Sequence, residues 1–130
     1  MITITGTIER EHYQVLLKSG TNELLADEPL SAGGLDKGFS PSELLAAALA
    51  ACTSATLRMY ADRKKWDLEK TAVKVMLEHN QAENRTDIAC EIRFFGNLSD
   101  AQKARLLEIA NRCPVHRTLT NPINIQTKLV

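Results

Sequence analysis

The stretch from Ser40 to Trp66, SPSELLAAALAACTSATLRMYADRKKW, constrains the fold of this chain more than any other feature. Ser40 is a good N-cap, Pro41 suits the first helical position, and Glu43 stands three residues after the cap, which is the pattern of a capping box. Residues 42–65 contain no glycine or proline, and three basic residues close the stretch, where the helix dipole favours positive charge. The stretch therefore predicts one helix about 36 Å long, with small apolar residues around most of its first half.

Length and charge limit the partners of such a helix. The chain has 130 residues, and 16 basic residues balance 16 acidic ones. This length suits a single domain over residues 1–130, and zero net charge gives no electrostatic footprint for nucleic acid or for an anionic membrane. The sequence shows neither a signal-peptide pattern nor an apolar run of about 20 residues, so we expect a soluble cytoplasmic protein.

Strand patterns precede the helix. Isoleucine and threonine alternate over residues 2–8, and short apolar runs at 13–17 and 23–26 flank a Ser-Gly-Thr-Asn turn. These patterns predict a three-stranded antiparallel meander. The segment 27–39, which contains three glycines, reads as a flexible connection to the helix cap.

Strand and helix patterns also follow the long helix. Residues 73–78 and 87–94 alternate around a polar turn and predict a hairpin, while Ser99 and Gln102 form a second capping box. We expect the second helix to end near Cys113, because Pro114 disfavours helical geometry in the residue before it. Residues 123–130 alternate again and predict a final strand.

The predicted order is βββ, α, ββ, α, β, which is an α+β domain. A long helix that is apolar on most of its surface in its first half needs more cover than one such chain supplies. We therefore expect a dimer partner.

The three cysteines, Cys52, Cys90 and Cys113, are an odd number spread along the chain. Such spacing argues against a secreted disulfide framework and leaves core packing, metal binding or redox chemistry. Cys90 shares the apolar face of its strand with isoleucines, which indicates a structural role. Cys113, at the predicted end of a helix, would be a poor attacking thiol because the dipole there disfavours negative charge.

Cys52 lies about three turns into its helix, so its thiolate would need a cation from elsewhere in the fold. The candidates are Arg10, Arg58, Arg112 and Arg117. The spacing of Cys113 and His116 could ligate zinc, but one such pair makes no site, so we expect no metal. The sequence contains no phosphate-binding glycine loop, G-x-S-x-G elbow or dinucleotide fingerprint.

The two cysteine segments together resemble the OsmC/Ohr family of osmotically inducible and organic hydroperoxide resistance proteins. SPSELLAAALAAC opens a helix with a proline and a carboxylate and reaches Cys52, and a later segment, NRCPVH, carries Cys113. The order of predicted elements matches over essentially the whole chain. The resemblance implies an OsmC-like fold in which two chains entwine as a homodimer, with the long helices buried centrally and two active sites at the interface.

The resemblance also implies a thiol-dependent peroxidase without metal, haem or flavin, serving oxidative stress defence. Cys52 would be the peroxidatic residue, which attacks an organic hydroperoxide and becomes a sulfenic acid. Cys113 would be the resolving residue, which condenses with that sulfenic acid to form a disulfide. An external dithiol, such as a lipoylated protein, would reduce the disulfide.

One position departs from the family pattern. Hydroperoxide-resistance members place a glutamate directly after the helix-opening proline, where it pairs with an arginine that holds the reactive thiolate. Here that position is Ser42, and Glu43 follows it. At 100° per residue Ser42 lies about 80° from Cys52 around the helix and Glu43 about 180°, so Glu43 is the nearest carboxylate substitute but suits capping better. Arg10 falls roughly where the activating arginine of the family would be, and the sequence resembles the OsmC-like branch.

Two other hypotheses remain from the residues alone. The chain could be a non-catalytic small-molecule-binding or redox-sensing protein, with an interface pocket lined by Leu, Ala and Phe39. It could also be purely structural, with all three cysteines inert in the core. The rate at which Cys52 reacts with an alkylating reagent separates these hypotheses from catalysis.

Overall fold

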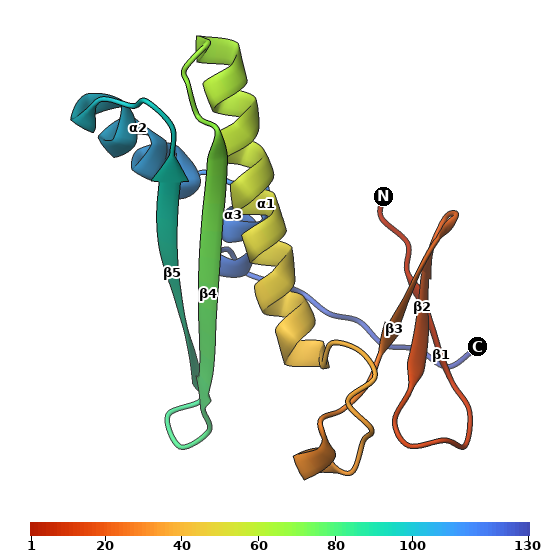
Figure 1. Ribbon diagram of the computed structural model, residues 1–130. Coiled ribbons are helices and arrows are strands. Elements are labelled where there is room, and N and C mark those ends of the chain that lie inside the picture. The colour runs from red at the N-terminus through yellow and green to blue at the C-terminus, as the bar shows by residue number, and fades with distance from the viewer. The chain divides into compact units, whose positions relative to one another are not determined.

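The structure, a computed structural model, describes residues 1–130. Its elements in chain order are β1 (Thr5–Ile8), β2 (Val15–Ser19), β3 (Asn22–Ala26), a 3₁₀ turn η1 (Leu30–Ala32), α1 (Pro41–Lys64), β4 (Lys70–Asn80), β5 (Arg85–Phe95), α2 (Asp100–Ala110) and α3 (Pro114–Thr120) (Figure 1). The α+β class is confirmed. The chain divides into two compact units, Met1–Leu45 and Ala46–Val130. The single domain over residues 1–130 stays a prediction.

The first unit contains the predicted antiparallel meander. Strand β2 pairs with β1 on one side and with β3 on the other, so the sheet order is β1-β2-β3. Gly20 has a positive φ of 57° in the turn between β2 and β3, a conformation that glycine adopts without steric cost. The alternation and the turn residues therefore predicted this sheet correctly.

The loop after β3 is organised around a buried carboxylate. Asp27 is 1% exposed and accepts hydrogen bonds from four backbone N–H groups. Gly34 and Gly38 pass so close to the backbone carbonyls of Glu28 and Leu25 that a side chain at either position would collide with them. The expectation of a flexible connection is therefore wrong, because the glycines here permit close backbone approach.

Helix α1 begins as its sequence predicted. Glu43 N donates to Ser40 Oγ at 3.3 Å, and Ser40 N donates to the Glu43 carboxylate at 3.1 Å, which is the reciprocal capping box. The helix ends at Lys64, and Lys65 follows with a positive φ. Its buried residues lie on one face and are Leu49, Thr53, Leu57, Tyr60 and Ala61.

The core of the second unit lies where α1 meets α2 and the β4–β5 hairpin. Leu57 and Leu106 are fully buried there, and Ile92 and Phe94 of β5 pack against the same cluster. The hairpin is antiparallel and pairs Val75 with Cys90. Helix α2 begins with the predicted capping box, because Gln102 N donates to Ser99 Oγ at 3.1 Å and Ser99 N donates to Gln102 Oε1 at 2.9 Å.

One helix in the C-terminal part of the chain was not predicted, and one predicted strand is absent. Helix α2 ends at Ala110, close to Cys113 as predicted, and Cys113 has the extended conformation expected before a proline. Pro114 then opens the additional helix α3, because its fixed φ suits the first helical position. Residues 123–130 form no strand, since no other strand of the chain pairs with them. Their alternating apolar side chains are exposed, for example Ile125 at 82%.

By length and composition alone α1 could cross a membrane, since one 18-residue window of it has a mean hydropathy of 1.3. We expected no apolar segment long enough to span a membrane, and α1 is an exception to that expectation. A single such helix is weak evidence for a membrane protein, because the core helix of a soluble protein passes the same test. Leu57 and Tyr60 of α1 belong to the core cluster of the second unit.

Candidate functional site

Cys113 lies just past the end of α2 and at the start of α3. It is fully buried and is the N-cap of α3, where its Sγ accepts a hydrogen bond from His116 N at 3.3 Å. Sequence reasoning treated Pro114 only as a stop signal and so placed Cys113 among the carbonyl groups that end α2. The structure instead places the backbone N–H of His116 beside the sulfur. The premise that only the carbonyl groups of a helix end surround Cys113 is therefore wrong.

A second contact joins Cys113 to helix α1. The Sγ of Cys113 lies 3.6 Å from the hydroxyl oxygen of Thr53, which is itself buried. Cys52 directly precedes Thr53 on α1 and is partly buried, at the edge of the buried face. The fold therefore brings the two cysteine-bearing segments together, although they are far apart in the sequence. The signal that could have located this meeting point was the buried polar Thr53, which occurs in an otherwise apolar stripe.

Three of the four candidate arginines can be placed relative to the rest of the second unit. Arg58 is committed to Asp62 at 2.7 Å and to the backbone carbonyl of Leu68. Arg112 lines a groove between α1 and α2, and Arg117 is exposed on α3. Arg58 is therefore occupied with holding the end of α1.

Two predicted site residues belong to the first unit. Arg10 is exposed in the turn between β1 and β2. The carboxylate of Glu43 accepts from Ser40 N, which confirms the capping role expected for it. Ser42 is exposed on the first turn of α1. The pairing of Arg10 with Cys52, and a catalytic role for Glu43, stay predictions.

Cys90 is exposed, although its strand pattern indicated a core position. Cys90 shares a face of β5 with Ile92, but only Ile92 packs against the buried cluster. Cys90 instead lines a hollow of about 460 Å³ together with Leu49 and His116. Partial burial raises the pKa of the Cys90 thiol, and the nearby Cys113 raises it further. Cys90 is therefore an exposed thiol near the buried thiol of Cys113.

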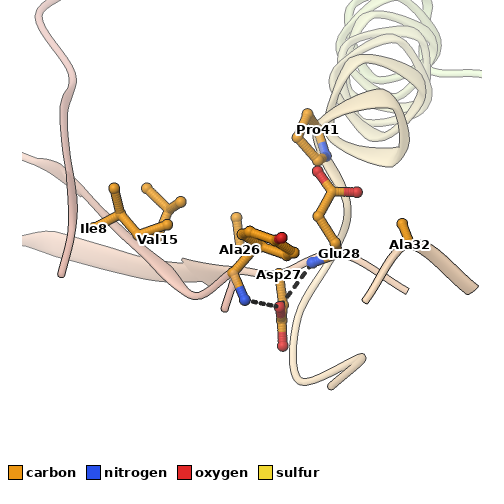
Figure 2. Close-up of a pocket in the computed structure, with 8 residues that line it drawn as sticks. Ile8, Val15, Ala26, Asp27, Glu28, Ala32 and Pro41 are labelled. Carbon is orange, nitrogen blue, oxygen red and sulfur yellow. Dashed lines mark hydrogen bonds between the residues drawn. The ribbon is translucent and has the colours of Figure 1, made fainter. Parts of the chain in front are cut away.

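The first unit holds its own hollow, of about 390 Å³ (Figure 2). Ile8, Val15 and Ala26 supply apolar walls, and Asp27 lies in it as the hydrogen-bonded carboxylate described above. Burial raises the pKa of Asp27, but the four backbone N–H donors outweigh this effect and hold that pKa below its ordinary value. The binding hypothesis placed Phe39 in a different pocket, at a dimer interface, and that pocket stays a prediction.

The remaining histidine and carboxylate groups are scattered. No group of three or more His, Cys, Asp or Glu side chains lies close enough together to hold a metal ion. What His116 contributes to Cys113 is a backbone N–H, not its imidazole ring.

Solved structures share this fold at low sequence identity. An OsmC-like protein from Mycoplasma pneumoniae matches with a TM-score of 0.79 and 23% identity, over 92% of this chain and 86% of that one. An organic hydroperoxide resistance protein OsmC from Legionella pneumophila matches with a TM-score of 0.70 and 21% identity, over 92% and 89%. One from Elizabethkingia anophelis matches with a TM-score of 0.71 and 24% identity, over 92% and 88%.

The fold is thus that of the OsmC-like proteins. The family model described as OsmC-like protein matches residues 34–128, and the chain belongs to that family. The matched residues include the segments of both Cys52 and Cys113. No protein of curated function matches the chain significantly.

Proposed function

We propose that this OsmC-like protein is a thiol peroxidase that reduces organic hydroperoxides, with Cys52 as the attacking thiol and Cys113 as the resolving thiol. The observation that carries the proposal is the contact between Thr53 and Cys113 at 3.6 Å, because it joins the helix of one cysteine to the other cysteine. The names of the proteins from Legionella pneumophila and Elizabethkingia anophelis, which include organic hydroperoxide resistance, support the substrate class.

The proposed cycle consumes one hydroperoxide and two thiols. The Cys52 thiolate attacks the distal oxygen of the hydroperoxide, the O–O bond breaks, and the alkoxide leaves as an alcohol after taking a proton. Cys52 is then a sulfenic acid. The Cys113 thiolate attacks its sulfur, the S–O bond breaks, and water leaves once a proton is added. The resulting disulfide is reduced by an external dithiol, for which a lipoylated protein is a candidate.

The surroundings of Cys113 suit the resolving step. Its sulfur lies beside α1, the helix that carries Cys52, and accepts a hydrogen bond from His116 N. Which cation activates Cys52 is part of the proposal, and Arg10 is the candidate. Ser42 stands where hydroperoxide-resistance proteins have a glutamate, so the arginine here would lack that partner.

Peroxide consumption tests the proposal directly. Purified protein with a dithiol is expected to reduce cumene hydroperoxide, and Cys52→Ser is expected to lose at least about a thousandfold in rate, as is usual for a nucleophile. Cys90→Ser is the matched control and is expected to retain the rate. Cys113→Ser is expected to support one turnover and then stop. Full activity in the Cys52→Ser variant would exclude the proposed mechanism.

We further propose that the active form is a cytoplasmic homodimer. Apolar side chains remain exposed at the start of α1, for example Leu45 at 53%, and in the C-terminal segment, for example Leu129 at 99%. An exposed apolar surface typically marks an interface. A second copy of the chain would cover it and would give residues 123–130 a strand to pair with.

A non-catalytic ligand-binding role is the second candidate. The apolar hollow in the first unit favours it, since its walls are predominantly apolar and it could enclose a small molecule. Reactivity separates the two functions. If Cys52 reacts with iodoacetamide no faster than a buried thiol, binding is favoured over catalysis.

A further inference from the structure

Helices α1 and α2 face each other across a groove of about 420 Å³. Four residues of α1 line one side, at i, i+3, i+4 and i+7 spacing, and they are Thr56, Met59, Tyr60 and Arg63. Arg105 and Ile109 of α2 line the other side, and Arg112 joins them from the turn that follows α2. Helix α1 therefore presents one continuous stripe to the groove.

The groove carries excess positive charge. Arg105 is the only one of its three arginines with a carboxylate partner, Glu108, at 2.8 Å. Arg63 and Arg112 take part in none of the salt bridges of the chain. Lys64 adds a further cation 5.8 Å from the ring of Tyr60. Asp62, the nearest carboxylate along α1, is paired with Arg58 instead.

Tyr60 lines this charged groove and contacts Arg105 across it. It is buried, and its hydroxyl oxygen accepts a hydrogen bond from Arg105 Nε at 3.0 Å. That hydrogen bond lowers the pKa of the phenol, burial opposes the shift, and the charges of Arg105, Lys64 and Arg63 lower the pKa further. The lowered pKa of Tyr60 therefore reflects the positive electrostatic potential in the groove.

These features match one chemical class of ligand. Guanidinium groups without carboxylate partners bind carboxylate or phosphate oxygens in bidentate fashion, and the hydroxyl of Thr56 offers a further donor. Met59 and Ile109 provide apolar contact beside the cations. We propose that the α1–α2 groove binds an organic anion, a carboxylate or a phosphate ester with a short apolar part. This proposal does not depend on peroxidase activity.

Trp66 supplies a direct probe of binding. It is the only tryptophan, and its ring stands edge-on to that of Tyr60, with centroids 5.6 Å apart. Hexyl phosphate and hexanoate are titrated against the protein at constant ionic strength, which holds general screening fixed. We expect a saturable change in Trp66 fluorescence for at least one of them. The one that binds more tightly identifies the head group, phosphate ester or carboxylate.

Paired variants then locate the site. The double variant Arg63→Gln, Arg112→Gln is expected to weaken binding by about tenfold or more, since each charged hydrogen bond lost costs appreciable affinity. The control double variant, Arg93→Gln, Arg117→Gln, removes the same charge from exposed positions outside the groove and is expected to bind as the wild-type chain does.

Three results would overturn the proposal. The first is the absence of saturable binding by either anion, and the second is unchanged affinity in the Arg63, Arg112 double variant. The third is an equal response to hexanol, which lacks the charge. Cys52→Ser is expected to bind the anions normally, so a failure of the peroxidase mechanism would leave this result unaffected.

Discussion

At the scale of single residues, Asp27 does more for the first unit than its position in a loop indicates. Oδ1 accepts from the backbone N–H groups of Tyr13 and Glu28, and Oδ2 accepts from those of Leu35 and Lys37. One side chain thus connects the turn between β1 and β2 to the loop that follows β3. A neutral amide of the same shape offers only one accepting oxygen.

We expect Asp27→Asn to lower the melting temperature by several degrees at pH 7, because its NH₂ group would face N–H donors. The pKa of Asp27 lies below its ordinary value of 3.8, so the carboxylate is favoured in the folded state. Its stabilisation is therefore complete above that ordinary value and is lost as pH falls through the lower, folded-state pKa. Thermal unfolding from pH 7 down to about pH 3 should show the wild-type advantage shrinking.

Asp36→Asn is the matched control for that prediction. Asp36 lies in the same loop, is exposed and has a positive φ of 53°, which asparagine also adopts. Its melting temperature should stay close to that of the wild-type chain. Hydrogen exchange at the amides of Leu35 and Lys37 gives a local readout, and unchanged protection in Asp27→Asn would contradict the role of Asp27.

At the scale of elements, the junction of α1 with α2 positions both the cysteine segments and the proposed anion groove. Leu57 and Leu106 are fully buried at this junction. The next residue along α2, Leu107, is 55% exposed. These two adjacent residues differ in burial because successive side chains of a helix are rotated by about 100° around its axis. That rotation takes the side chain from the core to the surface.

Leu106→Ala is expected to lower the free energy of unfolding by about 3 kcal/mol, through lost burial and the cavity left behind. Leu107→Ala deletes the same atoms from an exposed position of the same helix, and we expect a change below about 0.5 kcal/mol. Urea unfolding measures both. Equal losses in the two variants would show that this junction does not hold the second unit together.

At the scale of the whole molecule, both ends of the chain carry alternating apolar residues that nothing in the chain covers. Ile2 is 89% exposed and Ile125 is 82% exposed. An unpaired strand with an apolar face is unstable alone in water and readily pairs with another chain. This exposure is the physical basis of the proposed homodimer.

We expect the wild-type chain to sediment as a dimer and Ile125→Asp to shift it toward monomer by at least about tenfold in dissociation constant. Gln126→Asp adds the same charge one residue further along, where the strand alternation places the side chain on the opposite face. It should remain a dimer. Analytical ultracentrifugation over a concentration series distinguishes these results, and a monomeric wild-type chain would refute the homodimer.

Much of the local structure was predictable from the sequence. The cap of α1 by Ser40 and Glu43, the cap of α2 by Ser99 and Gln102, and the alternation of both sheets all depend on residues close together in the chain. Local hydrogen-bonding and side-chain period fix such features wherever the segment lies. Two segments had patterns that fit more than one structure. Pro114 could follow one helix or begin another, and the alternation over residues 123–130 does not by itself supply a strand to pair with.

Contacts between distant segments decided the rest. Sequence patterns did not predict the contact between Cys113 and Thr53, whereas the tertiary structure places Thr53 beside its sulfur and His116 N within hydrogen-bond distance. The four donors of Asp27 and the grouping of Arg63, Arg105 and Arg112 along one groove are likewise visible only when the chain is folded. The sequence by itself determined most of the helices and strands, and which thiols exist. The tertiary structure decided what surrounds each side chain, because burial, charge and hydrogen bonding depend on neighbours in space.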